Sequence, residues 1–233
     1  MLKVENLSKE FTMHIRGGKK IVTLSDISFQ VRKGEFLGIT GPSGIGKSSL
    51  LKCIYRTYLP SGGNIWYLSG EGEMVNLATV DDHKILELRR SEIGYVAQFL
   101  HVIPRVSALE VVSSALITQG VEPKAREERA KELFRRLGIP ASLWEMYPSS
   151  FSGGEKQRLN IIRGLISKPR LLLLDEPTAS LDPVSKREVI SLIQELKKEG
   201  TTMIGVFHDY ETLMKLADTQ LDINLKKCKE VCV

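Results

Sequence analysis

Eight residues between two apolar stretches have the types and spacing that bind a phosphate chain. Residues 41–48 read GPSGIGKS, which fits the pattern G-x-x-x-x-G-K-[ST]. An apolar run typical of a buried strand precedes them (35–40), and apolar residues at helical spacing follow (49–55). Glycines let several backbone N–H groups point inward, at the positive end of the following helix. The sequence therefore predicts a loop that holds the phosphates of a nucleoside triphosphate.

Two side chains of this loop have the chemistry for separate tasks. The Lys47 ammonium can reach the β- and γ-phosphates, and the Ser48 hydroxyl can ligate Mg²⁺. A glycine-rich turn with a solvated lysine is the structural alternative, but the flanking strand and helix favour phosphate binding. The expected nucleotide contacts in this segment are Gly41, Pro42, Ser43, Gly44, Ile45, Gly46, Lys47, Ser48 and Ser49.

A pair of carboxylates follows a run of four leucines. Residues 171–174 suit a central parallel strand buried on both faces, and ligands of such sheets sit beyond the carboxyl ends of the strands. We expect Asp175 to bind the Mg²⁺ that Ser48 also contacts. Glu176 is then placed to polarise a water for in-line attack on the γ-phosphate. A solvated strand end is the alternative.

Three more residues are candidates for contact with the nucleotide. Gln98 and His208 each follow a predicted buried strand (93–97 and 201–207). His208 could contact the γ-phosphate or orient the attacking water, although a lone histidine after a strand is more often structural. Phe11 could stack on adenine, because a base offers a flat face to an aromatic ring, or it could belong to the core.

The segment Ser152-Gly153-Gly154-Glu155 opens a predicted helix. Ser152 and Glu155 form a capping box, which is a sufficient structural explanation for those two. The two glycines cost on the order of 1 kcal/mol each relative to alanine, and they leave backbone N–H groups open at a positive helix end. We expect a second anion cradle, which holds the γ-phosphate of a nucleotide bound by another protomer. Two ATP molecules would then lie between two such domains.

The elements that must position these residues predict an α/β fold. We expect a phosphate-loop NTPase core with a mostly parallel sheet (1–98 and 168–233), an N-terminal antiparallel β region and an inserted helical subdomain (99–167). Residues 1–7 alternate like an edge strand, and 64–68 with 74–78 form a hairpin. Residues 99–104 are apolar, irregular and end in a proline, so they are our leading surface for a partner.

Composition narrows the class of protein. The chain has 233 residues, a net charge of +5 and 42% hydrophobic residues, as in an ordinary soluble domain, and no charge block argues for nucleic acid. An odd number of thiols (Cys53, Cys228 and Cys232) favours a reduced, cytoplasmic protein. No apolar run is long enough to span a bilayer, so we expect a partner to supply any membrane.

Taken in order, these motifs resemble those of an ABC-type ATPase over nearly the whole chain. Residues 41–48 resemble its Walker A motif, 152–155 its signature motif, and 171–176 its Walker B motif with the catalytic carboxylate. Residues 180–182 resemble the D-loop. The resemblance implies ATP and Mg²⁺ as ligands and a homo- or heterodimer of ATPases.

The same resemblance implies further roles at single positions. Gln98 matches the Q-loop, a catalytic residue and Mg²⁺ ligand, and His208 matches the switch histidine. Three positions depart from the family: in the signature motif Phe151 and Glu155 stand where Leu and Gln are usual, which can alter how the opposing ATP is held. Phe11 stands where Tyr is usual, which loses only a hydroxyl.

Three segments resemble a narrower group, the PhnL-type ATPase subunits of the bacterial phosphonate carbon–phosphorus lyase system. They are QFLHVIPRVSALEVV (98–112), YPSSFSGGE (147–155) and GVFHD (205–209). The resemblance implies an ATPase that works with soluble lyase-pathway proteins while α-D-ribose 1-methylphosphonate 5-triphosphate is made, without performing the nucleosidase chemistry. The alternative is the energy-coupling subunit of a transporter of the lipoprotein-release type, with a membrane permease as partner.

Overall fold

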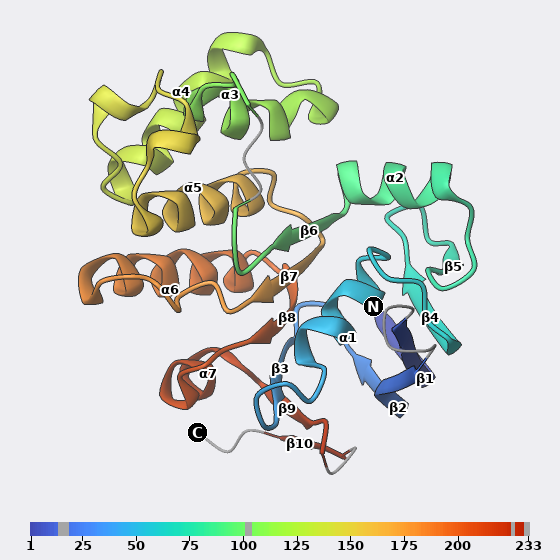
Figure 1. Cartoon of the computed structure of the whole chain (residues 1–233). Coiled ribbons are helices and arrows are strands. Elements are labelled where there is room, and N and C mark those ends of the chain that lie inside the picture. The colour runs from blue at the N-terminus through green and yellow to red at the C-terminus, as the bar shows by residue number, and fades with distance from the viewer. Residues whose placement is uncertain (14–18, 101–103, 225–226, 231–233) are drawn as a thin grey trace.

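The computed structural model describes residues 1–13, 19–100, 104–224 and 227–230, and it contains two sheets with helices around them (Figure 1). One sheet is four-stranded and antiparallel, and the other is six-stranded and mostly parallel. The expected α/β class, with an N-terminal antiparallel region, is confirmed. None of the helices within those ranges is both long and apolar enough to cross a bilayer.

The antiparallel sheet has the strand order β2-β1-β4-β5. Its strands are β1 (Leu2–Met13), β2 (Lys19–Val31), β4 (Gly62–Leu68) and β5 (Met74–Asn76). The expected hairpins β1–β2 and β4–β5 are present. The prediction of an edge strand at residues 1–7 is wrong, because β1 pairs with β2 on one side and with β4 on the other. Pairing with β4, about sixty residues away, leaves no mark in the local alternation.

The second sheet has the order β10-β9-β3-β8-β7-β6. Its strands are β3 (Phe36–Thr40), β6 (Ile93–Val96), β7 (Leu171–Asp175), β8 (Thr202–Val206), β9 (Thr219–Asp222) and β10 (Lys227–Glu230). All neighbours from β9 to β6 are parallel, and β10 is antiparallel to β9. The carboxyl ends of β3, β7 and β6 therefore meet at one edge of the sheet, which is where ligands of such sheets bind.

Alternate leucines of β7 pack into different cores. Leu172 and Leu174 belong to a core that also contains the buried side chains of the helical region (108–165). Leu171 and Leu173 belong to a second core, beneath the antiparallel sheet. Every residue of the strand is buried. The expectation of a central strand covered on both faces is confirmed.

The helices lie around the parallel sheet, with a helical region on one side (Figure 1). They are α1 (Lys47–Ile54), α2 (Asp82–Ser91), α3 (Ala108–Ser113), α4 (Pro123–Arg136), α5 (Gly153–Leu165), α6 (Pro183–Lys198) and α7 (Tyr210–Leu216). Short 3₁₀ helices are η2 (Ser114–Gln119), η3 (Ala141–Leu143) and η4 (Pro148–Ser150). Ser107 and Glu110 form a capping box at the start of α3, and the chain continues as the 3₁₀ helix η2 from Ser114.

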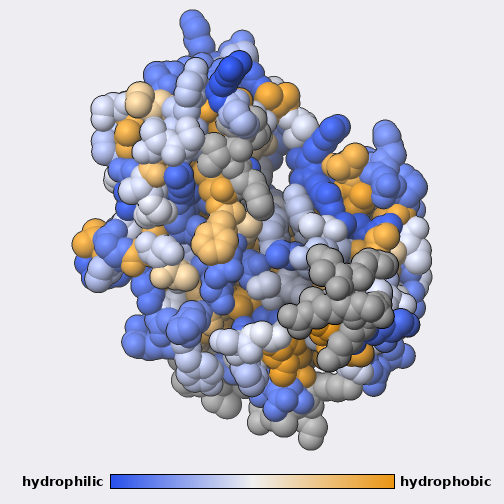
Figure 2. All heavy atoms as spheres, viewed as in Figure 1, coloured by the Kyte–Doolittle hydropathy of each residue, from blue (hydrophilic) through white to orange (hydrophobic). Residues whose placement is uncertain are grey.

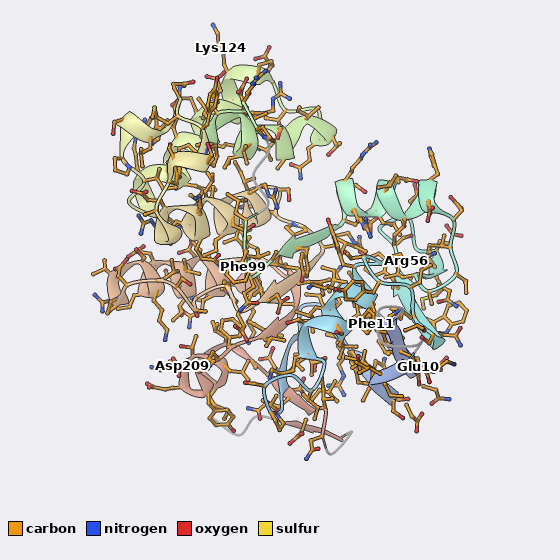
Figure 3. All side chains as sticks on the ribbon, in the orientation of Figure 1. Glu10, Phe11, Arg56, Phe99, Lys124 and Asp209 are labelled. Carbon is orange, nitrogen blue, oxygen red and sulfur yellow. The ribbon has the colours of Figure 1, made fainter. Side chains whose placement is uncertain are left out.

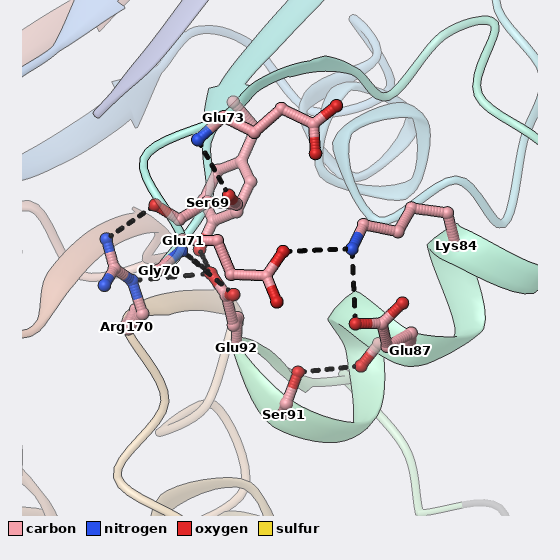
Figure 4. Close-up of polar contacts among 10 residues, drawn as sticks. Ser69, Gly70, Glu71, Glu73, Lys84, Glu87, Ser91, Glu92 and Arg170 are labelled. Atoms are coloured by element: carbon pink, nitrogen blue, oxygen red, sulfur yellow. Dashed lines mark hydrogen bonds and ion pairs between the residues drawn. The ribbon is translucent and has the colours of Figure 1, made fainter.

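A polar cluster fixes the junction between α2 and β6 (Figure 4). The Glu92 carboxylate accepts from the Tyr67 hydroxyl at 2.8 Å and from Gly70 N at 2.9 Å, and Arg170 Nε lies 3.4 Å away. The Glu92 backbone O accepts from Leu171 N at the start of β7. These contacts join the antiparallel sheet, α2 and β7. They therefore fix the position of the first residue of β6, the strand that leads to Gln98.

Candidate functional site

The phosphate loop joins β3 to α1, as its flanking sequence predicts. Gly46 is the N-cap of α1 with φ of 110°, and a Cβ there would lie 2.7 Å from Thr23 O. Only glycine fits that position, because φ is positive and because a Cβ would collide with Thr23 O. Lys47 Nζ donates to Gly41 O at 2.8 Å and to Pro42 O at 3.0 Å, so the lysine lies along the loop. Pro42, Ser43 and Gly44 are exposed, which leaves the loop accessible to a ligand.

Ser48 and Asp175 meet across the site. Ser48 Oγ donates to Asp175 Oδ1 at 2.7 Å, although 127 residues separate them, and Asp175 is 2% exposed. The second carboxylate oxygen, Oδ2, accepts from the Tyr95 hydroxyl at 2.9 Å. A hydroxyl and a carboxylate are the oxygen donors that Mg²⁺ prefers, and a few such ligands suffice when phosphates complete the shell. The residues present therefore fit a magnesium ion beside the phosphate loop.

Glu176 is the first residue beyond β7, and its backbone is left-handed. Its φ of 50° is uncommon for a residue with a side chain, and the Glu176 N–H donates to Val206 O at 3.0 Å. Gln98 Nε2 donates to Glu176 Oε2 at 3.0 Å. The structure therefore brings together the two side chains that follow β6 and β7. Such backbone strain concentrates at functional sites.

His208 is exposed and lies beside the segment that follows Glu176. A cleft of about 330 Å³ is lined by Thr178, Ala179, Leu181, Lys186, His208 and Asp209. Asp209 caps α7, and its carboxylate accepts from Lys186 Nζ at 2.6 Å and from Thr212 Oγ1. These hydrogen bonds lower the pKa of Asp209, and the bond from Lys186 has the largest effect. The ion pair fixes the backbone next to His208 against the start of α6.

The second glycine motif starts α5 as a capping box. Glu155 Oε2 accepts from Ser152 N at 2.7 Å, and these bonds to Ser152 lower the pKa of Glu155. A Cβ at Gly153 would meet no atom within 4 Å. A Cβ at Gly154 would lie 3.7 Å from Ser180 O, an ordinary contact. Packing within the chain therefore explains neither glycine.

Three polar side chains of α5 join it to the site, and local sequence patterns did not point to them. Gln157 Nε2 donates to Pro177 O, and Asn160 Nδ2 donates to Ala97 O, so each bonds the backbone next to a candidate catalytic residue. Arg158 Nη1 donates to Ser185 Oγ and lies 3.6 Å from Asp182 Oδ2. The available signal was the pair Gln157 and Asn160, two polar residues three positions apart on the buried face of a helix.

Phe11 and Phe99 lie in different surroundings (Figure 3). The Phe11 ring packs edge-on against Tyr58 with centroids 5.1 Å apart, and Lys9 Nζ lies 4.6 Å from its centroid. None of the described contacts joins Phe11 to the phosphate loop, so stacking on adenine stays a prediction. Phe99 is 69% exposed, directly after Gln98. The rest of the segment expected to bind a partner includes 101–103, which lie outside the described residues.

Comparison with known proteins agrees with this geometry. The family model for the ABC transporter matches residues 24–179. The uncharacterized ABC transporter ATP-binding protein YvrO of Bacillus subtilis is 35% identical over 92% of this chain and 90% of its own length. The macrolide export ATP-binding/permease protein MacB of Vibrio parahaemolyticus is 33% identical over 96% of this chain, which spans only 33% of that protein.

Among solved structures, a dimeric post-hydrolysis state of the ATP-binding cassette MJ0796, bound to ADP and Pi, superimposes with a TM-score of 0.88. The match covers 100% of both chains at 28% identity. A second dimeric structure of MJ0796 matches equally well. From the family model, which spans more than half of the sequence, and from relatives aligned over most of it, the chain belongs to the ABC transporter family as an ATPase subunit that binds ATP with Mg²⁺, hydrolyses it and dimerises.

Proposed function

We propose that this ATPase is an accessory subunit of the phosphonate carbon–phosphorus lyase system and that a partner bound beside Gln98 controls its hydrolysis of ATP. The observation that carries the proposed control by a partner is that the exposed, apolar Phe99 directly follows Gln98, which bonds Glu176. A partner seated on Phe99 would act on the next residue along the chain.

In the proposed site, each residue has one task. Lys47 and the loop backbone hold the β- and γ-phosphates, and Glu176 polarises the attacking water. Ser48, Asp175 and Gln98 hold Mg²⁺, which neutralises charge that develops on the phosphates. His208 orients the γ-phosphate, and Phe11 faces the base. The short contacts from Ser48 to Asp175 and from Gln98 to Glu176 support this assignment.

The site is completed by a second protomer. Gly153 and Gly154 are open on the surface of the chain, and α5 presents its positive N-terminal end there. Because internal packing does not require these glycines, we assign them to the γ-phosphate of the opposing ATP. The ionised Glu155 lies in the capping box and replaces the usual Gln without losing the cap.

A basic cleft offers the partner a second surface, apart from Phe99. Figure 2 shows a hollow between the helical region and α2. A cleft of about 340 Å³ lies between α2, β6, η2 and α5; its charged lining residues are Arg89, Arg90 and Arg163, without an acidic side chain. Tyr55 and Tyr95 also line it. Protein-binding surfaces are enriched in Tyr and Arg and depleted in Lys, Glu and Asp. We therefore infer that an acidic segment of a partner protein binds there.

Two exposed apolar side chains extend this surface. Leu86 is one helical turn before Arg89 and Arg90 on α2, and Ile117 is one 3₁₀ turn after Ser114 on η2. Thr118 Oγ1 donates to Arg90 O, which joins the two sides of the cleft at one end. A cleft lined by arginines, with Leu86 and Ile117 exposed beside it, suits a peptide segment that carries acidic and apolar residues.

The phosphonate role rests on the similarity of residues 98–112, 147–155 and 205–209 to the lyase-system ATPases. One observation favours a second candidate, the energy-coupling subunit of a transporter: the relatives YvrO and MacB carry transporter names, and MacB includes a permease. Both candidates place a partner on the same surface. We also propose a cytoplasmic location, since Cys53 is a free buried thiol and the chain has an odd number of cysteines.

Affinity purification with cross-linking separates these two candidates. Tagged protein is recovered from its source organism, grown with methylphosphonate as the phosphorus source, and its cross-linked partners are identified by mass spectrometry. We expect soluble lyase-pathway proteins, cross-linked near α2 and η2. An integral-membrane permease recovered in their place would replace the phosphonate role with the transporter role.

A charge reversal tests the surface itself. Arg90 is exposed and lies outside the proposed ATP site. Arg90→Glu should therefore weaken the affinity for the partner by about tenfold or more, while basal ATP hydrolysis is unchanged. Lys124→Glu, on the exposed start of α4 (Figure 3), is the matched control and should keep the partner. Equal binding by both variants would contradict the basic cleft as the partner site.

A further inference from the structure

Both oxygens of the Asp175 carboxylate are held by hydroxyl groups from different elements. Ser48, at the start of α1, donates to Oδ1, and Tyr95, on β6, donates to Oδ2. Asp175 is 2% exposed, so water contributes little to fixing it. A carboxylate held on one oxygen can rotate about its last torsion, which is a broad well for aspartate. Held on both, it has one orientation.

Tyr95 is itself fixed by its neighbours. Its ring stacks on that of Tyr55 with centroids 4.9 Å apart and planes at 21°. Arg89 Cζ lies 4.4 Å from the centroid of the Tyr55 ring, and Arg89 Nε donates to Tyr55 O. Tyr95 pairs in register with Leu173, two residues before Asp175 on the neighbouring strand. The hydroxyl therefore reaches Asp175 from a rigid strand and not from a loop.

The Tyr95 hydroxyl is a donor, because a phenol keeps its proton at neutral pH. A protonated phenol has one hydrogen to donate, and the geometry gives that hydrogen to Asp175. The ring does not touch the phosphate loop in any described contact, so its effect on the site must pass through the carboxylate.

We propose that Tyr95 is a positioning residue for magnesium: its hydroxyl fixes the orientation of the Asp175 carboxylate toward Ser48 and thereby sets the affinity of the protein–ATP complex for Mg²⁺. The inference rests on the proposed role of Asp175 as a magnesium ligand. Groups that hydrogen-bond a metal ligand orient it, and their loss weakens metal affinity 10- to 100-fold in other proteins. Tyr95 itself lines the basic cleft, so an occupant of the cleft would be separated from Asp175 only by the Tyr95 ring.

Tyr95→Phe removes the hydroxyl and keeps the ring and its stack. Binding of a fluorescent ATP analogue is measured against free Mg²⁺ concentration, and separately in EDTA. We expect about tenfold more Mg²⁺ for half-maximal binding, with affinity in EDTA unchanged. Hydrolysis should fall at low Mg²⁺ and recover at high Mg²⁺. Wild-type dependence on Mg²⁺ in the binding assay would overturn the proposal.

Tyr67→Phe is the matched control. Tyr67 is also a buried tyrosine whose hydroxyl donates to a carboxylate, that of Glu92 at 2.8 Å. Neither Tyr67 nor Glu92 belongs to the proposed magnesium site. The variant should lose stability without a change in Mg²⁺ dependence. A similar shift in both variants would show that Tyr95 acts only through general stability, which would also overturn the proposal.

Asp175→Asn separates failure of this inference from failure of the site. If Asp175→Asn shifts the Mg²⁺ dependence and Tyr95→Phe does not, Asp175 is a ligand and the positioning role of Tyr95 is refuted. If neither variant shifts it, the magnesium assignment of Asp175 is refuted, and the inference with it. The expected result is a shift in both, with the larger shift in Asp175→Asn.

Discussion

At the scale of single residues, the site depends on side chains that are already held by the protein itself. Lys47 donates to two loop carbonyls, Ser48 to Asp175 and Gln98 to Glu176. A ligand that replaces these acceptors exchanges one set of hydrogen bonds for another. For Lys47, the net gain on binding is therefore the difference between its charge-assisted bonds to phosphate and its bonds to the loop carbonyls.

Lys47→Ala should abolish detectable binding of ATP. The ammonium is the one cation that the phosphate-loop motif itself supplies, and charge-assisted bonds to phosphate are about twice as strong as neutral ones. Isothermal calorimetry with Mg-ATP measures the loss. Lys52→Ala, one helical turn later on α1, should bind ATP normally. ATP affinity of wild-type strength in Lys47→Ala would contradict the assignment.

Glu176→Gln should bind ATP and barely hydrolyse it. The amide keeps the shape and can still meet Gln98, but it cannot accept a proton, so turnover should fall by about 10²- to 10⁴-fold. The variant should accumulate as an ATP-bound dimer, visible by size-exclusion chromatography with light scattering. Glu127→Gln, on α4, is the control for the substitution. Normal turnover in Glu176→Gln would show that another group polarises the water.

At the scale of elements, the α5 helix would serve both halves of the proposed composite site. Its N-terminal glycines face outward, while Gln157 and Asn160 bond the backbone beside Glu176 and Gln98. A shift of this helix on dimer closure would therefore move the backbone at two strand ends. No comparable set of side-chain bonds from another described helix reaches both strand ends.

Gly153→Ala should stabilise the monomer and impair the dimer. The new methyl group meets no atom of the chain, and alanine favours the helix by up to about 1 kcal/mol. On the proposed dimer face, the same methyl group would block approach of the opposing γ-phosphate. We would measure urea unfolding, and ATP-induced dimerisation in the Glu176→Gln background.

Gly62→Ala is the matched control, because a Cβ there also meets open space, away from the proposed interface. It should leave dimerisation unchanged. If Gly153→Ala dimerised as well as Gly62→Ala, the second anion cradle would be ruled out at this position.

At the scale of the whole molecule, an ion pair joins α4 of the helical region to α6 across a cavity. A cavity of about 540 Å³, lined by side chains of α4, the α5–β7 connection and α6, lies there, away from the phosphate loop. The Arg136 guanidinium on α4 spans it and bonds Glu195 on α6 with both terminal nitrogens. The Glu195 contact raises the pKa of Arg136 and the Arg136 contact lowers that of Glu195, which agrees with one ion pair.

Arg136→Ala should loosen α4 more than it destabilises the protein. Because the pair is partly exposed, we expect a loss of less than about 1 kcal/mol in the free energy of unfolding. Hydrogen exchange should rise selectively in residues 123–136. Lys168→Ala removes a more exposed pair, with Glu199, and should leave α4 unchanged. Uniform exchange across the chain in Arg136→Ala would contradict a local role for the pair.

The local patterns of the sequence determined much of this protein. The glycine loop, the capping boxes at Ser107 and Ser152, and the buried strand 171–175 follow from spacing and hydrophobic period, and the structure contains all of them. Each depends on residues within about ten positions of one another, so the sequence displays it directly.

Only the tertiary structure decided which distant segments meet. It made β1 an inner strand, placed Phe11 against Tyr58, put Tyr95 beside Asp175 and gathered Arg89, Arg90 and Arg163 around one cleft. Strand order and helix placement are set by the burial of faces against each other across the whole chain. A one-dimensional pattern shows that a face must be covered, and packing in three dimensions selects what covers it.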